Sequence, residues 1–370
     1  MKILYDHQIF TMQVVGGVSR YFSELIKGLS NCDSTELNLS LKFSNNIYLR
    51  EFGFDSHHSF FKNYPFKGRR RVQRIFNNWN SRKDIIRGNY DLFHPTYYHP
   101  YHLSYSTQKP LVLTVYDMIH EKLPELFPPT DNTALVKRKL VNRADKIIAI
   151  SESTKKDLID ILHVDAEKIE VVYLANSLPD KHRDVIGERS ISLPEKFILF
   201  VGRRSEYKNF HRFLNATIKL MRKDEELEIV CTASQGFGKK EKEYFEELGI
   251  TGRIHAFYFN EDQLRTAYKK ASAFVFPSLY EGFGLPLLES FAASCPVVCS
   301  NSSSLPEIAE NASLYFDPYS EQEIQNSISK VLYNEGLRQR LIKNGRERLK
   351  KFSWERTVDE TLGVYKSLSN

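Results

Sequence analysis

Two glutamates in the C-terminal half of the sequence, Glu281 and Glu289, flank the segment Gly282-Phe283-Gly284-Leu285. This segment follows a predicted strand and opens a predicted helix, and its glycines allow a ligand to approach the backbone closely. A helix N-terminus offers free N–H groups to an anion such as a phosphate, and carboxylates accept hydrogen bonds from sugar hydroxyls. Taken alone, the two glutamates could also be solvated charges on an amphipathic helix. In this context they predict a site for an elongated ligand with hydroxyl and phosphate groups.

A second group of candidates, Gly202, Arg203 and Lys208, follows the predicted strand Phe197–Val201 and precedes a predicted helix. Gly202 allows a tight turn, Arg203 offers a planar fork for phosphate oxygens, and Lys208 offers a compact charge. Surface cations at loops are common. A pair of them near a helix terminus and the glutamate segment nevertheless fits a diphosphate better than either feature alone.

Paired glycines, Gly16 and Gly17, precede the first predicted helix, where backbone N–H groups can meet an anion. No GxGxxG follows them, and Gly282-Phe283-Gly284 also lacks the third glycine of that motif. The sequence therefore does not carry the dinucleotide-binding fingerprint, and it has no P-loop.

Polar residues follow two predicted strands of the first half. His94 ends one of these strands, and Tyr116, Asp117 and His120 lie at the end of the next one. The carboxyl ends of parallel strands are where ligands bind in open α/β sheets. Asp117 is the strongest candidate, because an acid directly after an apolar strand calls for a functional explanation. A histidine at such a position is more often structural.

A basic and aromatic segment spans residues 60–87, where Lys and Arg outnumber the single acid, Asp84. Cations interleaved with aromatic side chains suit the surface of an anionic membrane. The same composition also occurs in segments that bind single-stranded nucleic acid, and a solvated helix face over core aromatics is a third explanation. The candidates for membrane contact are Lys67, Arg69, Arg70, Arg71, Arg74 and Trp79.

These residues need a scaffold, and apolar runs alternate with helical patterns along the whole sequence. The predicted strands are Lys2–Tyr5, Leu37–Phe43, Asp91–His94, Leu111–Tyr116, Lys146–Ile150, Ile169–Leu174, Phe197–Val201, Leu227–Thr232, Arg253–Phe259, Ala273–Pro277, Pro296–Ser300 and Ser313–Phe316. Their apolar character predicts strands that are buried on both faces of parallel sheets. A break at 175–194 is the expected linker, so we predict two doubly wound α/β domains that face an interdomain cleft.

The helices between these strands are expected near Gly17–Leu29, Arg69–Ile86, Asn132–Arg143, Glu152–Leu162, Asn209–Arg222, Lys239–Leu248, Glu261–Ala271, Leu285–Ala293, Leu305–Glu310, Glu321–Tyr333 and Leu337–Lys350. Ser151 is the expected N-cap of the helix at 152–162, and Ser353 caps a last helix that continues to about Leu368.

Composition sets limits on the class of protein. The 370 residues are 41% hydrophobic and 26% charged, as in an ordinary globular protein. No uncharged apolar stretch is long enough to span a bilayer, and a formal charge of +6 is too weak to indicate nucleic-acid binding. The spacing of the four cysteines matches no zinc-binding pattern. We interpret them as small hydrophobic residues with reduced thiols, so we expect a cytoplasmic protein.

Taken together, the motifs resemble the retaining glycosyltransferases of family four (group 1), which have the GT-B fold. The resemblance rests on the Gly16-Gly17 loop, on Gly202-Arg203 with Lys208, and on the glutamate pair Glu281 and Glu289. It extends to the segments at 304–307, 316–318 and 352–354. Within the family the sequence looks most like the mannosyltransferases of bacterial O-antigen and capsule assembly. Tyr116 stands where many relatives have His.

The resemblance implies residue roles. Glu289 would bind the ribose, whereas Glu281 and the backbone of Phe283, Gly284 and Leu285 would hold the donor sugar. Arg203 and Lys208 would neutralise the diphosphate leaving group, and Gly17 would contact it from the other domain. The final helix would return to the first domain, which gives an acceptor-binding domain of 1–180 plus 355–370 and a donor-binding domain of 190–354.

The implied activity is retaining transfer of a hexosyl group, with mannosyl from GDP-mannose as the first choice, to a hydroxyl of a glycan or lipid-linked saccharide. Donors carrying UDP, ADP or dTDP remain alternatives, as do a phosphorylase or a sucrose- or glycogen-type synthase. A non-catalytic membrane- or RNA-binding protein on the same scaffold is the non-enzymatic alternative. The resemblance implies no metal and no cofactor, since the nucleotide sugar is a substrate. The weak net charge gives no reason to expect a nucleic-acid partner. We expect a location in the cytoplasm, and on the inner face of the cytoplasmic membrane if the acceptor is lipid-linked and residues 60–87 contact the membrane.

Overall fold

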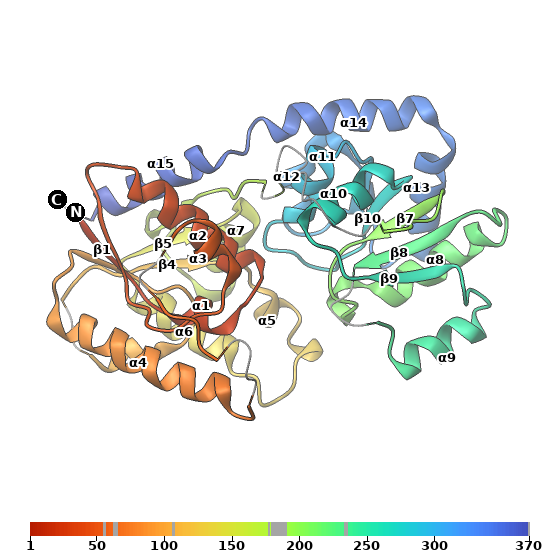
Figure 1. The fold of residues 1–370 in the computed structure, drawn as a ribbon. Helices are drawn as coiled ribbons and strands as arrows, with labels where there is room; N and C mark the ends of the chain where they lie inside the picture. Colours follow the sequence, from red (N-terminus) through yellow and green to blue (C-terminus); the bar gives the residue numbers. More distant parts are fainter. Residues whose placement is uncertain are drawn as a thin grey trace. The chain divides into compact units, whose positions relative to one another are not determined.

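The computed structural model describes residues 1–54, 57–61, 66–105, 108–176, 178, 191–232 and 236–368. Most of the linker expected at 175–194, and residues 62–65 of the basic segment, lie outside the described residues. The chain divides into two compact units, one formed by Met1–Leu174 with Ser353–Asn370 and the other by Ala175–Phe352 (Figure 1). We refer to them as the N-terminal and the C-terminal unit.

The N-terminal unit contains two parallel three-stranded sheets, with strand orders β2-β1-β3 and β4-β5-β6. Their strands are β1 (Lys2–Tyr5), β2 (Glu36–Leu39), β3 (Leu92–His94), β4 (Val112–Val115), β5 (Lys146–Ala149) and β6 (Ile169–Val171). A single parallel bridge between Phe93 and Leu111 joins β3 to the start of β4. Most residues of β1, β3, β4 and β5 are buried, which confirms the prediction of parallel strands covered on both faces.

The helices of the N-terminal unit are α1 (Gln8–Met12), α2 (Gly17–Ser30), α3 (Ile47–Glu51), α4 (Arg69–Arg87), α5 (Ile119–Lys122), α6 (Thr133–Arg143), α7 (Glu152–Leu162) and α15 (Trp354–Lys366). Ser151 caps α7 as predicted, since its hydroxyl accepts a hydrogen bond from the backbone N–H of Thr154. The short helices α1, α3 and α5 were not predicted, because segments of four or five residues carry too little periodicity to be recognised.

Helix α15 packs in the N-terminal unit although it lies far along the sequence, since its Thr357 is 184 residues from the Tyr173 that it contacts. Its Thr357 hydroxyl donates to the carbonyl of Tyr173 at 2.7 Å. Its Val358 packs against Gly28 of α2 so closely that a Cβ at position 28 would lie 2.3 Å from a methyl group. Ser353 caps the helix by accepting from the N–H of Arg356, as predicted.

The C-terminal unit is built on one six-stranded parallel sheet in the order β12-β11-β10-β7-β8-β9. Its strands are β7 (Phe197–Phe200), β8 (Glu228–Thr232), β9 (Ile254–Phe257), β10 (Ala273–Phe276), β11 (Val297–Ser300) and β12 (Ser313–Phe316). Its helices are α8 (Phe210–Met221), α9 (Lys239–Glu247), α10 (Glu261–Lys270), α11 (Leu285–Ala292), α12 (Leu305–Ala309), α13 (Glu321–Tyr333) and α14 (Glu335–Leu349).

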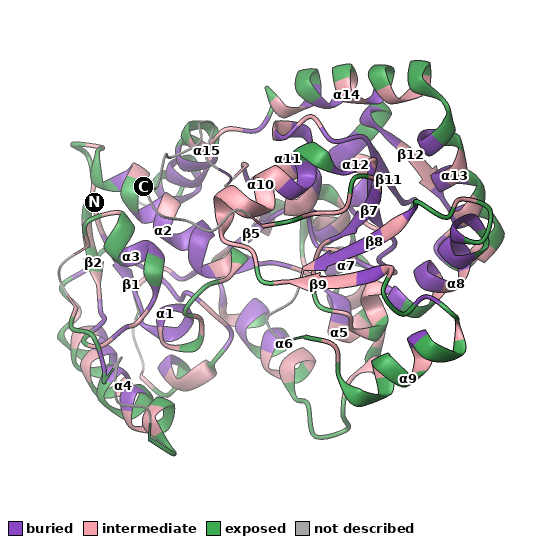
Figure 2. Ribbon diagram, turned by 45° about the vertical axis from the view of Figure 1, so that its right-hand side comes forward, coloured by how far each residue is buried: buried purple, intermediate pink, exposed green. Residues whose placement is uncertain are grey.

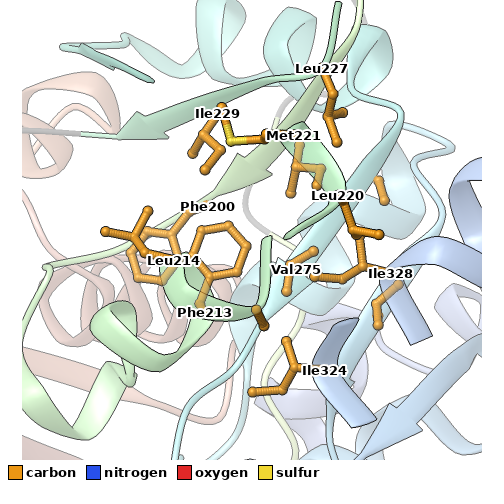
Figure 3. Packing of buried hydrophobic residues seen from close by; sticks show 14 of the residues in the cluster. Phe200, Phe213, Leu214, Leu220, Met221, Leu227, Ile229, Val275, Ile324 and Ile328 are labelled. Atoms are coloured by element: carbon orange, nitrogen blue, oxygen red, sulfur yellow. The ribbon is translucent and has the colours of Figure 1, made fainter. Parts of the chain in front are cut away.

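A hydrophobic core between this sheet and the helices α8 and α13 fixes the central strands. Buried residues lie along β7 and β8 (Figure 2). Figure 3 shows Phe200 and Val275 of the sheet beside Phe213 and Leu214 of α8 and Ile324 of α13, all buried. Burying a side chain of this size contributes about 1.5–3 kcal/mol. The core therefore anchors β7 and β10, whose carboxyl ends carry the predicted site residues.

Among the described helices, none has both the length and the apolar character that crossing a bilayer requires.

Candidate active site

Lys208 and Glu281, from the loops that follow β7 and β10, are in direct contact. Lys208 Nζ lies 2.5 Å from Glu281 Oε1, and the two side chains are only 13% and 14% exposed. The ammonium group also lies 5.0 Å from the centre of the Phe276 ring. Burial alone would lower the pKa of Lys208, but the charge of Glu281 and its hydrogen bond raise that pKa above its usual value. Lys208 therefore places a positive charge at the carboxyl edge of the sheet.

Asn209 holds Lys208 in this position. It adopts a left-handed backbone conformation with φ of 58°, which asparagine tolerates better than most residues. Its side-chain amide donates to the carbonyls of Pro277 at 3.1 Å and Pro318 at 2.7 Å. The turn that carries Lys208 is therefore bonded to two neighbouring segments of the sheet edge.

Gly202 lies beside the Lys208 stem, in a backbone conformation that favours glycine. Its φ is +126°, and a Cβ there would lie 3.5 Å from Lys208 Cε. The Gly202 N–H donates to the Thr232 hydroxyl at the end of β8, at 2.9 Å. The turn predicted at this glycine is therefore present and bonded to the neighbouring strand.

Two serines hold the backbone of the glutamate loop. The Ser303 hydroxyl accepts from the N–H of Glu281 at 2.8 Å. The Ser304 hydroxyl lies 2.9 Å from the carbonyl oxygens of both Glu281 and Phe283. Sequence reasoning noted Ser304 only as part of a family pattern and missed Ser303. The run of serines directly after β11 was the available signal.

Gly284 is the residue directly before α11, and glycine is needed there for two reasons. Its φ is +106°, and a Cβ would lie 2.9 Å from Leu305 Cδ2. Phe283 before it is buried and packs edge-on against the ring of Phe352, at 5.9 Å between centres. Leu285 opens the helix and is half-buried. The loop is thus closely packed, as expected for a segment that presents its backbone to a ligand.

Glu289 lies on α11, eight residues after Glu281. Its Oε2 accepts a hydrogen bond from the Tyr268 hydroxyl at 3.0 Å. Burial and the nearby charge of Glu289 raise the pKa of Tyr268 well above its usual value, so the phenol remains a donor. This bond orients the carboxylate from α10.

Two adjacent arginines after β7 differ in what they contact. Arg204 is ion-paired with Glu241 at 2.5 Å, and its guanidinium lies 4.9 Å above the Phe237 ring. Arg203 is exposed and makes no hydrogen bond or ion pair with the residues that the structure describes. Arg204 therefore supports the fold, whereas Arg203 is available to a ligand.

In the N-terminal unit, Gly16 and Gly17 precede and begin α2 as predicted. Gly16 has an extended backbone that any residue can adopt, but a Cβ there would lie 2.4 Å from the side-chain oxygen of Gln13. That oxygen accepts a hydrogen bond from the N–H of Ser19 at 3.1 Å. Gly17 is exposed, so its backbone is open to a ligand.

His94 lies in the protein core, which argues against the acceptor-side role expected from the sequence. It is fully buried, with Nδ1 2.6 Å from the Tyr365 hydroxyl and Nε2 2.9 Å from the Thr114 hydroxyl. The Tyr365 hydroxyl also bonds to that of Tyr5 at 2.7 Å. His94 therefore links β3 and β4 to α15 and is a structural residue.

The buried imidazole predicts a dependence of stability on pH. Burial lowers the pKa of His94 to about 3, whereas the unfolded chain binds the proton near pH 6.5. Between these two pH values the unfolded state holds more protons than the folded state. The free energy of unfolding therefore falls by up to about 1.4 kcal/mol for each unit by which the pH is lowered. In urea titrations at pH 7, 6 and 5, the free energy of unfolding of His94→Gln should fall less between pH 7 and pH 5 than that of the wild type. Equal losses would contradict this assignment.

Tyr116 and Asp117, which follow β4, differ in exposure. Tyr116 is 7% exposed, and its hydroxyl lies 3.3 Å from the carbonyl of Thr96, so it belongs to the core rather than to an acceptor surface. The Asp117 side chain is 35% exposed. The fully buried Lys137 holds the adjacent backbone by donating to the Asp117 carbonyl at 2.8 Å and to Glu121 Oε2 at 2.9 Å. Sequence reasoning missed Lys137, because nothing in its helical pattern marks it as buried.

His120 is half-buried next to this loop. Its ring stacks on Phe127 with 4.0 Å between centres, and Nε2 lies 3.8 Å from Asp131 Oδ2. The ring is thus held in place by an aromatic neighbour and faces a carboxylate.

Helix α4 has the reverse of the usual burial pattern. Its buried side chains are mostly polar and bond to the N-terminal unit, namely Gln73, Asn77 and Ser81, together with Ile85. Its exposed large apolar side chains are Ile75, Phe76, Trp79 and Ile86. Of the predicted membrane-contact residues, Lys67, Arg70, Arg71, Arg74 and Trp79 are exposed, and Arg69 donates to the carbonyl of Phe61. The sequence hypothesis of core aromatics beneath a solvated face therefore does not describe Phe76 and Trp79.

Comparison with known proteins gives two family matches. The model of glycosyltransferase family 4 matches residues 15–175, and that of glycosyl transferases group 1 matches residues 183–348. O-antigen chain mannosyltransferase B of Escherichia coli is 28% identical over 288 residues, which cover 74% of this chain and 73% of the relative. O-antigen chain mannosyltransferase RfbU of Salmonella typhimurium is 29% identical over 222 residues, which cover 59% of this chain and 60% of the relative.

Solved structures resemble the whole chain. Sucrose-phosphate synthase from Thermosynechococcus elongatus matches with a TM-score of 0.75 and 17% identity, covering 99% of this chain and 98% of the other. HepE from Anabaena, crystallised with UDP and glucose, matches with a TM-score of 0.74 and 19% identity, covering 99% and 100%. At these identities the likeness concerns the fold.

Proposed function

Because the chain belongs to the group 1 and family 4 glycosyltransferases and has the predicted GT-B fold, we propose that it transfers a hexosyl group from a nucleoside diphosphate sugar to a hydroxyl of a glycan or lipid-linked saccharide. GDP-mannose is the proposed donor, because relatives named O-antigen mannosyltransferases are similar over much of their length. UDP, ADP and dTDP sugars are the alternatives that an experiment must separate.

The observation that carries this proposal is the contact between Lys208 and Glu281 at the carboxyl edge of the C-terminal sheet. A cation beside a carboxylate suits a sugar diphosphate, whose phosphate oxygens need positive charge and whose hydroxyls need acceptors. In this proposal Lys208 and Arg203 bind the diphosphate, Glu281 and the backbone of residues 283–285 bind the sugar, and Glu289 binds the ribose. Gly17 contacts the diphosphate, and Asp117 acts near the acceptor hydroxyl.

The proposed step breaks the bond between the anomeric carbon and the phosphate oxygen and forms a bond from the acceptor oxygen on the same face of the sugar. The bonding electrons leave with the diphosphate, and the proton of the acceptor hydroxyl passes to the leaving phosphate oxygen. Negative charge therefore grows on the diphosphate, where fixed cations stabilise it best. The protein's own Lys208 and Arg203 supply that charge, so the proposal includes no metal and no cofactor.

A thermal-shift panel with GDP, UDP, ADP and dTDP tests the proposal. A ligand that binds only the folded state raises the melting temperature, and the rise grows with the ratio of its concentration to its Kd. We expect GDP to give the largest shift, and incubation with GDP-mannose and an acceptor glycan to yield a product with retained anomeric configuration by NMR. A response to none of the nucleotides would contradict the transferase proposal and favour the non-catalytic alternative.

The second proposed partner is an anionic membrane surface, with α4 as the contact. The exposed apolar side chains of α4, among them Trp79 at 58% and Ile86 at 60% exposure, lie on a helix that also carries Arg70, Arg71 and Lys83. Apolar groups enter the interface while cations meet anionic lipid headgroups, and each such cation adds about 1 kcal/mol. This contact would place the enzyme at the inner face of the cytoplasmic membrane.

Flotation with vesicles tests the membrane contact. The wild-type chain should float with vesicles that contain phosphatidylglycerol and should float less as salt rises, because the cations are screened. The double variant Trp79→Ser/Ile86→Ser should lose most of this binding, whereas an exposed change elsewhere, Tyr258→Ser, should not. Equal flotation of both variants would exclude α4 as the contact.

A further inference from the structure

A hollow of about 310 Å³ opens in the N-terminal unit, and none of the residues proposed for the transfer reaction lines it. Its polar lining comes from His102, Ser104, Tyr105, Lys109 and Arg143. Because Lys109 and Arg143 shortly precede β4 and β5, the hollow lies near the amino ends of these strands. Open α/β sheets bind their substrates at the opposite, carboxyl edge. This hollow therefore calls for an explanation other than the transfer chemistry.

His102 is buried in the wall of this hollow. It is only 4% exposed, and neither ring nitrogen has a hydrogen-bond partner among the residues that the structure describes. The His99 carbonyl, the weakest of the influences on the pKa of His102, already accepts from the Gln8 amide at 3.2 Å. Buried polar groups in proteins are nearly always paired. A buried imidazole that the chain leaves unpaired beside a hollow therefore points to a ligand.

The His102 ring offers one donor and one acceptor rather than a charge. Burial lowers the pKa of His102 to about 4, so the ring is neutral at pH 7. A neutral imidazole donates a hydrogen bond through one nitrogen and accepts one at the other. A hydroxyl group can also donate and accept, so it matches this ring better than a carboxylate or an ammonium group does.

Two cations add a charged part to the same hollow. Lys109 is half-buried, and its ammonium group makes no hydrogen bond or ion pair with any residue that the structure describes. Arg143 fixes the Lys109 backbone by donating to its carbonyl at 3.3 Å, and it also bonds to Asp145 at 3.0 Å. No aspartate or glutamate of the described ranges lines the hollow to neutralise Lys109. Phosphate oxygens are the groups that Lys and Arg bind through strong, charge-assisted hydrogen bonds.

Apolar side chains complete the wall, namely Ile85 of α4, Phe93 and Leu111. The Phe93 ring meets the His102 ring edge-on, at 5.1 Å between centres, and so holds the imidazole in place. The volume lies at the lower end of the range for small-molecule sites. The hollow thus combines a hydroxyl-binding ring with cations, and it has room for a small ligand.

We propose that this hollow binds a hydroxylated phosphate ester, with the phosphate on Lys109 and Arg143 and a hydroxyl group on the His102 ring. A soluble polyol phosphate and the headgroup of phosphatidylglycerol share this chemistry. The site is separate from the proposed transfer reaction, so the inference does not depend on the identity of the donor or the acceptor.

NMR titration of the full chain, labelled with ¹⁵N-histidine and free of nucleotide, tests the site. The probes are glycerol, inorganic phosphate, glycerol 3-phosphate, and dihexanoyl phosphatidylglycerol below its micelle concentration. At least one of the two esters should bind about tenfold more tightly than glycerol or phosphate alone. It should also shift the ring signals of His102, which are assigned by their loss in His102→Gln. Tighter binding of glycerol 3-phosphate would identify a soluble ligand, and tighter binding of the phosphatidylglycerol a lipid headgroup.

Variants of Lys109 test the phosphate contact without disturbing the fold, because its ammonium group bonds to nothing in the described part of the chain. Lys109→Gln should weaken binding of the preferred ester by about ten- to hundredfold, and Lys109→Arg should restore part of the loss. The matched control Lys156→Gln changes an exposed lysine of α7 outside the hollow and should bind as the wild type does.

Two results would overturn the inference. One is the absence of any shift of the His102 signals with either ester, and the other is unchanged ester binding by Lys109→Gln. If His102→Gln does not fold, the comparison of Lys109→Gln with Lys156→Gln still decides between a ligand site and an unused hollow.

Discussion

Replacing Arg203 by Gln should lower kcat by about a hundred- to thousandfold while the melting temperature stays within 1–2 °C, roughly the change expected for an exposed surface site. The loss is large because charge that develops on the leaving diphosphate would no longer meet one of its two proposed cations. Stability is retained because the exposed Arg203 side chain makes no bond to the described part of the chain. Steady-state kinetics and thermal denaturation of the same preparation measure the two effects.

The neighbouring Arg204 is the matched control. Arg204→Gln removes an equal charge but also breaks the ion pair with Glu241 and the contact with the Phe237 ring. We therefore expect the opposite result, namely a lower melting temperature with turnover retained within a few fold. Near-normal turnover of the Arg203 variant would remove this residue from the proposed mechanism.

The second large effect is expected at Lys208, where activity and stability should fall together. Lys208→Met leaves the carboxylate of Glu281 without its cation in a site where that side chain is only 14% exposed. Breaking a buried pair in this way costs about 3 kcal/mol or more. The same change removes a cation from the proposed diphosphate site, so kcat should again fall by about a hundredfold or more.

The double variant Lys208→Met/Glu281→Gln distinguishes the two effects. Because it removes both charges together, it should recover most of the stability that the single variant loses, and urea titrations measure this recovery. Turnover should not recover, since the site would then lack both charged groups. A single variant as stable as the wild type would show that the ion pair contributes nothing to the fold.

Much of the C-terminal site could be predicted from the sequence because its signals are local. Gly202 adopts positive φ just after β7 and Gly284 adopts it directly before α11, and Lys208 and Glu281 lie in the segments that follow β7 and β10. Since parallel strands share one carboxyl edge, residues after two neighbouring strands come close together, as they do here. The contact between Lys208 and Glu281 follows from the order β10-β7 within the sheet.

The N-terminal unit was harder to predict because its important contacts are distant in sequence. His94 is buried by Tyr365, which lies 271 residues away, and no local pattern indicates that partner. Lys137 is buried although a lysine at that helical position usually faces water. His102 was not predicted as a site residue, since only the folded chain brings it to the same hollow as Lys109.

Helix α15 has a consequence for how this protein is made. A domain at the start of a chain ordinarily folds during synthesis, before the later domains have been translated. Here the core around Tyr5 stays open until the ribosome has passed Tyr365, because the hydroxyls of these two residues bond to each other. The first-made half is therefore the last to be completed, and the nascent chain must keep its unfinished interior from aggregating while the other half is translated.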